Sequence, residues 1–159
     1  MHAATTPQPQ FPGRIAGIDF GTVRIGIALT DRERRMASPH ANYARRSAAL
    51  DADFFRRLVA DEAIVQFVVG LPVHLDGHES QKSYEARTFG KWLADATGVP
   101  VVFFDERFST SQAEDYLAGM GLTKKKRKAR LDMLAAQVML AAFLESGQPS
   151  SQTPQGLDD

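Results

Sequence analysis

Residues 14–30 read RIAGIDFGTVRIGIALT, two apolar runs separated by a short turn. The first run, residues 14–20, ends at Gly21, and the second run covers residues 24–30. Short isoleucine-rich runs bounded by glycine are typical of β-strands joined as a hairpin. The folded part of the chain is therefore predicted to begin with an antiparallel pair of strands.

Further strands are predicted downstream of this hairpin. A weak extended segment around residues 36–45 contains Pro39, which suits only an edge strand or a bulge. The runs at 63–69 and 99–104 are nearly all apolar, as expected of strands covered on both faces. Because helical patterns separate these later strands, they are expected to be parallel. The fold class is therefore α/β, with a five-stranded mixed sheet flanked by helices.

Helices are predicted where apolar residues recur with helical spacing, over residues 50–61 and 79–97, the second ending at Gly98. The apolar side of the second helix is predicted to comprise Tyr84, Phe89, Trp92 and Leu93. Ser111 and Glu114 form a capping-box pattern that predicts a short helix to about residue 117. A last, deeply packed helix is predicted over residues 131–145.

The length of 159 residues and the 43% hydrophobic content fit one globular domain, predicted over residues 14–146. Residues 1–13 and 147–159 are polar and contain proline, so flexible tails are expected there. The absence of cysteine excludes disulfides and zinc–thiolate sites. No apolar stretch reaches the roughly 20 residues that span a bilayer, and no secretory signal is recognised, so a cytoplasmic location is expected.

The net charge is zero, with nineteen bases and nineteen acids, but the charges are unevenly distributed. Six of the bases lie in residues 124–130, which leaves thirteen bases against nineteen acids elsewhere. A basic run is usually a solvated loop. Beside Asp132, at the start of the predicted last helix, it could instead hold a polyanion, so a neutral total does not exclude a nucleic-acid substrate.

Acidic residues stand where a mixed sheet gathers its ligands, outside the carboxyl ends of strands. Asp19 ends the first strand, Asp105 and Glu106 follow the last strand, and Asp132 opens the last helix. Adjacent strand residues point to opposite faces, so only one of Asp105 and Glu106 is expected to enter a shared site. Converging acids would hold two divalent cations, about 3.5–4 Å apart, for phosphodiester cleavage.

Each of these residues also has a simpler interpretation. Asp19 could cap the turn after its strand, residues 105–107 could form surface ion pairs, and Asp132 could be a helix N-cap. His74, Asp76 and His78 alternate like metal ligands, but a turn at Asp76 and Gly77 explains them better. Ser109, Thr110 and Ser111 are interpreted as helix caps that could still contact phosphate.

Four ordered motifs resemble one family. GIDFGTVRIGIALTD (17–31), VVGLPVHLDG (68–77), FFDERFSTSQAE (103–114) and LDMLAAQVMLAAFLE (131–145) closely resemble the YqgF/RuvX family of pre-16S rRNA nucleases and Holliday junction resolvases. The resemblance covers residues 14–145. The chain departs from the family pattern at Phe108, where leucine is common. This departure does not affect Asp19, Glu106 or Asp132.

The resemblance implies an RNase H-like fold and a nuclease that uses Mg²⁺ or Mn²⁺ held by Asp19, Glu106 and Asp132. It favours processing of the 5′ end of the 16S rRNA precursor in the cytoplasm, with Holliday junction resolution as the alternative, by a monomer or homodimer. Arg107 is expected to clamp phosphate. The expected substrate contacts are Gly21, Thr22, Arg24, Asp105, Arg107, Ser109, Thr110, Lys124, Lys125, Lys126, Arg127, Lys128 and Arg130.

Two other functions remain open at this stage. Residues 19–22, Asp-Phe-Gly-Thr, also resemble the phosphate-binding hairpin of actin-like ATPases and sugar kinases, which use two such domains around a nucleotide. This chain has room for one such domain. The other alternative is a non-catalytic RNA-binding factor in ribosome assembly, in which the acids are structural.

Overall fold

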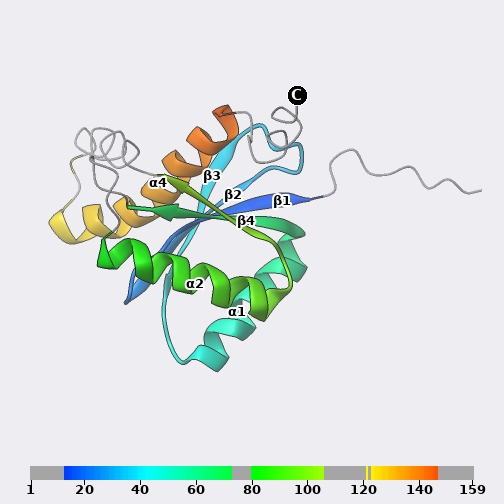
Figure 1. The fold of residues 1–159 in the computed structure, drawn as a ribbon. Coiled ribbons are helices and arrows are strands. Elements are labelled where there is room, and N and C mark those ends of the chain that lie inside the picture. The colour runs from blue at the N-terminus through cyan, green and yellow to red at the C-terminus, as the bar shows by residue number, and fades with distance from the viewer. Residues whose placement is uncertain (1–12, 73–79, 106–120, 122, 147–159) are drawn as a thin grey trace, which may run out of the picture.

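A five-stranded sheet is the centre of the computed structural model, which describes residues 13–72, 80–105, 121 and 123–146 (Figure 1). The described elements, in chain order, are β1 (Arg14–Asp19), β2 (Arg24–Thr30), β3 (Ala37–Ala44), α1 (Ala48–Glu62), β4 (Ile64–Leu71), α2 (Gln81–Thr97), β5 (Val101–Asp105) and α4 (Lys124–Glu145). The short helix predicted from Ser111 lies outside the described residues.

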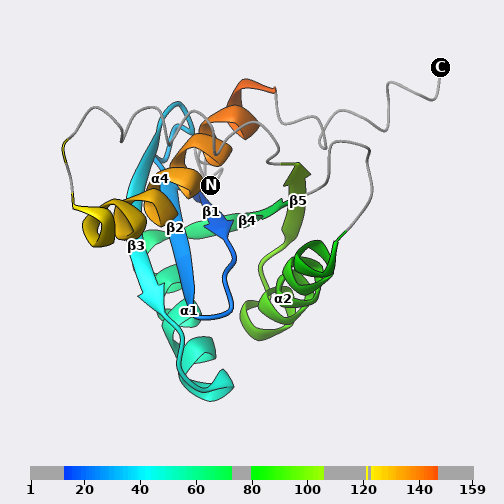
Figure 2. The same ribbon diagram turned by 90° about the vertical axis from the view of Figure 1, so that its left-hand side faces the viewer.

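The strand order is β3-β2-β1-β4-β5. The pairs β1–β2 and β2–β3 are antiparallel, whereas β1–β4 and β4–β5 are parallel. Helices α1 and α2 lie on one face of the sheet and α4 lies on the other (Figure 2). The predicted α/β class and mixed sheet are therefore confirmed, with β1 as the central strand.

Side-chain alternation along β1 divides the core into two layers. Ala16 and Ile18 pack into the cluster beneath α1 and α2, whereas Ile15 packs with residues of α4. Gly17 shares the α4 face, where a Cβ atom would lie 2.9 Å from Leu140 Cβ. A glycine is thus required for the helix to approach the sheet this closely.

Strand β3 is an edge strand, as Pro39 predicts. Its register with β2 shifts between Ile27 and Ala28, the irregularity expected of a bulge. A bulge and a proline together limit how well this edge can pair with another strand.

Helices α1 and α2 begin and end with local caps. Ser47 and Ser80 are N-caps whose side chains accept backbone N–H groups, and Gly98 ends α2 with φ of 73°. Phe89 and Leu93 are buried as predicted, but Tyr84 is 63% exposed. The prediction for Tyr84 was wrong because spacing alone cannot separate the edge of an apolar stripe from its centre.

Helix α4 begins at Lys124, not at residue 131 as predicted. The basic segment 124–130 is therefore helical rather than a loop. Lysine and arginine are good helix formers, and the Thr123 side chain accepts the Lys126 N–H at 3.2 Å as the N-cap. The predicted start was too late because the prediction followed apolar periodicity, which the first two turns lack.

Replacing Thr123 by alanine tests this helix start. We expect a loss of about 1 kcal/mol in the free energy of unfolding, because the cap hydrogen bond to the Lys126 N–H is removed. Thr123→Ser keeps the oxygen and is the matched control. Denaturant unfolding measures both variants, and an unchanged midpoint for Thr123→Ala would contradict a helix that starts at Lys124.

Candidate active site

Asp19 is the last residue of the central strand and is half-buried. Because Ile15 and Gly17 face α4, alternation also places Asp19 on the α4 face. Strands β4 and β5 run parallel to β1, so their carboxyl ends reach the same side of the sheet. Asp19 therefore stands at the edge of the sheet where ligands are expected.

The residues flanking Asp19 in the neighbouring strands are glycines. Asp19 pairs with Gly26 of β2, and Ile18 pairs with Val69, which places Gly70 of β4 on the other side. Val68, two residues before Gly70, packs beneath α4. Both glycines thus share the face of Asp19, and the carboxylate lies between two positions that have no side chain.

The turn after Asp19 is tight. A Cβ atom on Gly21 would collide with the backbone oxygen of Arg24, so the turn requires glycine there. Thr22 and Arg24 are exposed beside it. The three predicted substrate contacts of this hairpin are therefore together, next to Asp19 in the chain.

Asp105 ends β5 and is exposed. Val102 and Phe104 pack beneath α4, whereas Val101 and Phe103 pack against the opposite cluster, so alternation assigns Asp105 to the α1/α2 face. The structure does not bring Asp105 onto the face of Asp19. Glu106, Arg107, Ser109 and Thr110 lie outside the described residues, as do His74, Asp76 and His78.

Asp132 lies inside α4, so its interpretation as a helix N-cap is wrong. It precedes Ala136 by about one turn, and the Ala136 carbonyl oxygen is 3.4 Å from where a Cβ of Gly17 would stand. Asp132 therefore belongs to the helix that covers β1. Among the residues described, no three acidic, histidine or cysteine side chains form a group that could hold a metal ion.

The first two turns of α4 concentrate positive charge. The bases of this segment are Lys124, Lys125, Lys126, Arg127, Lys128 and Arg130. No acid lies in the first turn, and both Lys126 and Arg130 are exposed. Like charges four residues apart and bases at the positive end of a helix dipole each destabilise the helix. A bound polyanion would offset that cost.

The comparisons with known proteins agree with the four motifs. The family model described as "RuvX: Holliday junction resolvase" matches residues 13–146. The chain belongs to the RuvX family. A protein of Rhodopirellula baltica named "Putative pre-16S rRNA nuclease" is 46% identical over 144 residues, which cover 89% of this chain and 83% of that protein. A Sphingopyxis alaskensis protein of the same name is 37% identical, covering 89% and 97%.

Solved structures show the same fold at low sequence identity. RuvC of T. thermophilus, in complex with a Holliday junction substrate, superposes with a TM-score of 0.55 at 16% identity, covering 85% of this chain and 96% of RuvC. This RuvX-family chain therefore has the RuvC-like, RNase H-like architecture that the motifs predict. No helix in the described ranges is both long and apolar enough to cross a membrane.

A buried polar network lies behind the Asp19 turn and was not predicted for this RuvX-family chain. Asp51 of α1 is 1% exposed and accepts hydrogen bonds from Tyr43 Oη at 2.6 Å and the Arg46 N–H at 2.9 Å. Arg45 Nε lies 3.5 Å from Asp51 Oδ2. The sequence could have indicated this network, because Asp51 has helical spacing with Phe55 and Leu58 and so lies on the buried side of the helix.

Burial raises the pKa of Asp51, but its hydrogen bonds from Tyr43 and the Arg46 N–H, with the nearby Arg45 charge, hold the pKa below its ordinary value of 3.8. We expect Asp51→Asn to lower the free energy of unfolding by about 1–3 kcal/mol at neutral pH. Because the pKa of Asp51 is lower in the folded state than in the unfolded state, its carboxylate stabilises the fold at pH values above the unfolded-state pKa. This stabilisation is lost as the pH falls through the folded-state pKa. The deficit of the variant should therefore shrink only in acid, below about pH 4.

Denaturant unfolding across pH measures this deficit. Asp53→Asn is the control, since Asp53 is an exposed acid of the same helix, 3.6 Å from Arg56, and surface pairs contribute about 0–1 kcal/mol. A deficit for Asp51→Asn that grew as the pH fell would contradict the assignment.

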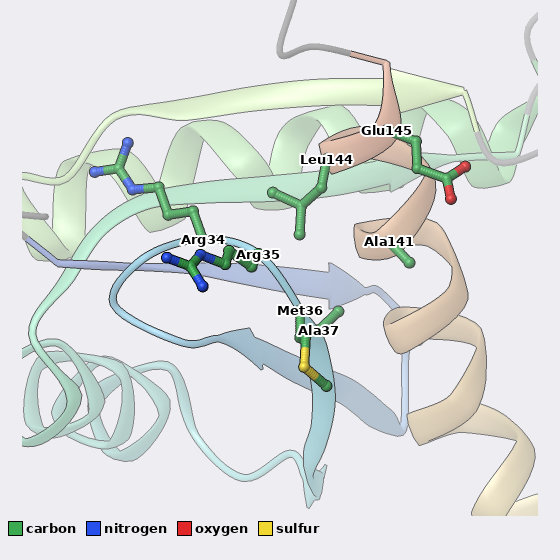
Figure 3. Close-up of a pocket in the computed structure, with 7 residues that line it drawn as sticks. All are labelled: Arg34, Arg35, Met36, Ala37, Ala141, Leu144 and Glu145. Carbon is green, nitrogen blue, oxygen red and sulfur yellow. The ribbon is translucent and has the colours of Figure 1, made fainter.

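The cavity in Figure 3 is separate from the Asp19 site. It measures about 340 Å³ and lies between the β2–β3 hairpin and the last turns of α4. Its lining residues are Arg34, Arg35, Met36, Ala37, Ala141, Leu144 and Glu145. Ala37 pairs with Thr30, at the end of β2 remote from the Asp19–Gly26 pair. The cavity therefore lies toward the other end of the sheet.

Proposed function

We propose that this chain is a nuclease that hydrolyses phosphodiester bonds in structured nucleic acid. The observation that carries the proposal is the position of Asp19 at the carboxyl end of the central strand, on the face covered by α4. In Figure 1 the basic first turns of α4, in yellow, lie toward the end of the sheet where β1 and β4 finish. A carboxylate and a polyanion-binding segment are thus arranged around one edge.

The proposed catalytic acids are Asp19, Glu106 and Asp132. Adjacent strand residues point to opposite faces and Asp105 lies on the α1/α2 face, so we propose Glu106 as the acid of this pair that enters the site. Asp132 belongs to the helix that covers that face. These three acids are therefore proposed to meet above β1, while Asp105 stays on the opposite face.

The acids fit Mg²⁺ or Mn²⁺, because carboxylate oxygens are the hard ligands that these ions prefer. The two glycine positions beside Asp19 keep neighbouring side chains off the carboxylate. Bound there, two divalent ions would supply Lewis-acid stabilisation of the phosphate charge and a more acidic water. The chain's own contribution is to hold the carboxylates in place and to orient the phosphate.

Substrate binding is assigned mainly to the first two turns of α4. Lys124–Arg130 would contact phosphates on both sides of the scissile bond, and the helix strain caused by like charges would be relieved on binding. Arg107 is proposed to clamp the scissile phosphate. Gly21, Thr22, Arg24, Ser109 and Thr110 are proposed as further contacts near the acids.

The substrate we favour is the extended 5′ end of the 16S rRNA precursor, in the cytoplasm. This choice is supported by the two relatives, 46% and 37% identical to this chain, that are named as pre-16S rRNA nucleases. Holliday junction resolution is the second candidate, supported by the description of the matching family model. Symmetric cutting of a junction would favour a homodimer, whereas cleavage of the precursor is compatible with a monomer.

Cleavage assays with purified protein test the proposal. A 5′-extended 16S precursor fragment should be cut only when Mg²⁺ or Mn²⁺ is present, and chelation should stop the reaction. Binding without cleavage under every metal condition would favour the non-catalytic assembly factor. Turnover of ATP without cleavage of nucleic acid would favour the actin-like ATPase alternative.

A further inference from the structure

Arg45, at the junction of β3 and α1, contacts both ends of the turn between β1 and β2. Its backbone N–H donates to the Val23 oxygen at 2.9 Å. Its guanidinium carbon lies 5.2 Å from the centroid of the Phe20 ring, within cation–π range. Phe20 directly follows Asp19, so Arg45 bridges the turn that begins at the candidate catalytic acid.

The Arg45 side chain is itself held from several sides. The guanidinium also lies 5.7 Å from the ring of Phe89, which packs 4.8 Å from the Phe20 ring, centroid to centroid. On its other side, Nε is 3.5 Å from the buried Asp51 carboxylate. Because Asp51 also accepts hydrogen bonds from Tyr43 and the Arg46 N–H, its position is fixed by the fold.

Asp19 and Phe20 point to opposite faces of the sheet, since Phe20 packs against the α1/α2 cluster. A restraint on Phe20 therefore fixes the backbone of Asp19 from the α1/α2 face of the sheet, without any contact with substrate. Gly21 makes the turn tight, so a shift at Phe20 is transmitted to Asp19 rather than absorbed within the turn.

We propose that Arg45, oriented by Asp51, is a positioning residue that fixes the direction of the Asp19 carboxylate. The inference rests on the proposed function of Asp19. Errors of about 1 Å in the placement of a catalytic group can cost about 100-fold in rate. Arg45 therefore matters for the chemical step and not for binding of the substrate.

The test separates rate from affinity in the full-length chain. Arg45→Ala should slow single-turnover cleavage of a 5′-extended 16S precursor fragment roughly 10- to 100-fold, with Kd for the fragment changed less than about threefold. Arg45→Lys, which keeps the charge beside Asp51, should recover part of the rate. Arg57→Ala is the matched control, because Arg57 is an exposed base of α1 and its loss removes the same charge.

Amide hydrogen exchange gives a readout that needs no activity. The amide of residue 45 reports the hydrogen bond to the Val23 oxygen, and its protection should fall about tenfold or more in Arg45→Ala as the turn opens more often. The Ile27 amide in the core strand should keep its protection. If Arg45→Ala fails to fold, Phe20→Leu removes the ring beneath the guanidinium and should give the same split between rate and Kd.

The outcomes distinguish this inference from the proposed function. If the wild type cleaves, Asp19→Asn does not, and Arg45→Ala cleaves as fast as Arg57→Ala, the positioning role is overturned while the nuclease stands. Parallel losses of rate and affinity would also overturn it. A wild type that cleaves no nucleic acid overturns the proposed function, and the exchange measurement then still decides whether Arg45 anchors the turn.

Discussion

Asp19→Asn is expected to reduce cleavage at least about 10³-fold, because it removes the charge of a proposed metal ligand and with it roughly 4 kcal/mol of transition-state stabilisation. Asparagine keeps the size of the side chain at the end of β1, so the fold should be unaffected. Binding should persist within a few-fold, since phosphate contacts supply most of the affinity. Single-turnover cleavage and equilibrium binding measure the two effects.

Asp105→Asn is the matched control for this substitution. Asp105 also ends a strand parallel to β1, the edge strand β5, but alternation assigns it to the opposite face. Its replacement should leave the cleavage rate within a few-fold of the wild type. Equal losses for the two variants would contradict the assignment of the site to the α4 face.

Replacing Lys124, Lys125 and Lys126 together by alanine should weaken nucleic-acid binding roughly 10- to 100-fold at low salt. Three phosphate contacts account for a slope of about 2–3 in the dependence of log K on log salt concentration, so the slope should flatten by that amount. Alanine is a strong helix former, so α4 should be retained. Binding titrations at several salt concentrations measure the slope.

A second triple variant controls for the loss of charge. Arg57, Lys82 and Lys91 are exposed bases of α1 and α2, on the other side of the sheet. Alanine at these three positions should change the slope by less than one. Equal flattening by both triple variants would mean that binding responds to total charge and not to the first turns of α4.

Much of the fold is predictable because its signals are local. Short isoleucine-rich runs bounded by glycine predicted β1 and β2, and Pro39 predicted that β3 is an edge strand. Gly98 marked the end of α2, where a positive φ favours glycine. The start of α4 was missed because its first turns have no apolar stripe, and there only helix propensity and the Thr123 cap carried the signal.

The candidate site was predictable only in part. Asp19 could be placed from the strand pattern. Alternation predicts that only one of Asp105 and Glu106 enters the site, and the structure tests this for Asp105, which it assigns to the α1/α2 face. The position of Gly26 and Gly70 beside Asp19 depends on the register of β1 with β2 and β4, which cannot be read from any one segment of the sequence. The contacts of Arg45 with Phe20 join segments that the chain brings together only on folding.

One measurement tests the central claim most directly: the wild type and Asp19→Asn, each incubated with a 5′-extended 16S precursor and with a branched DNA duplex, with and without Mg²⁺. We predict metal-dependent cleavage of the precursor by the wild type, slower or no cleavage of the branched duplex, and no cleavage by Asp19→Asn, which still binds. Equal cleavage of the precursor by Asp19→Asn, or cleavage that continues after removal of the metal, would contradict this account.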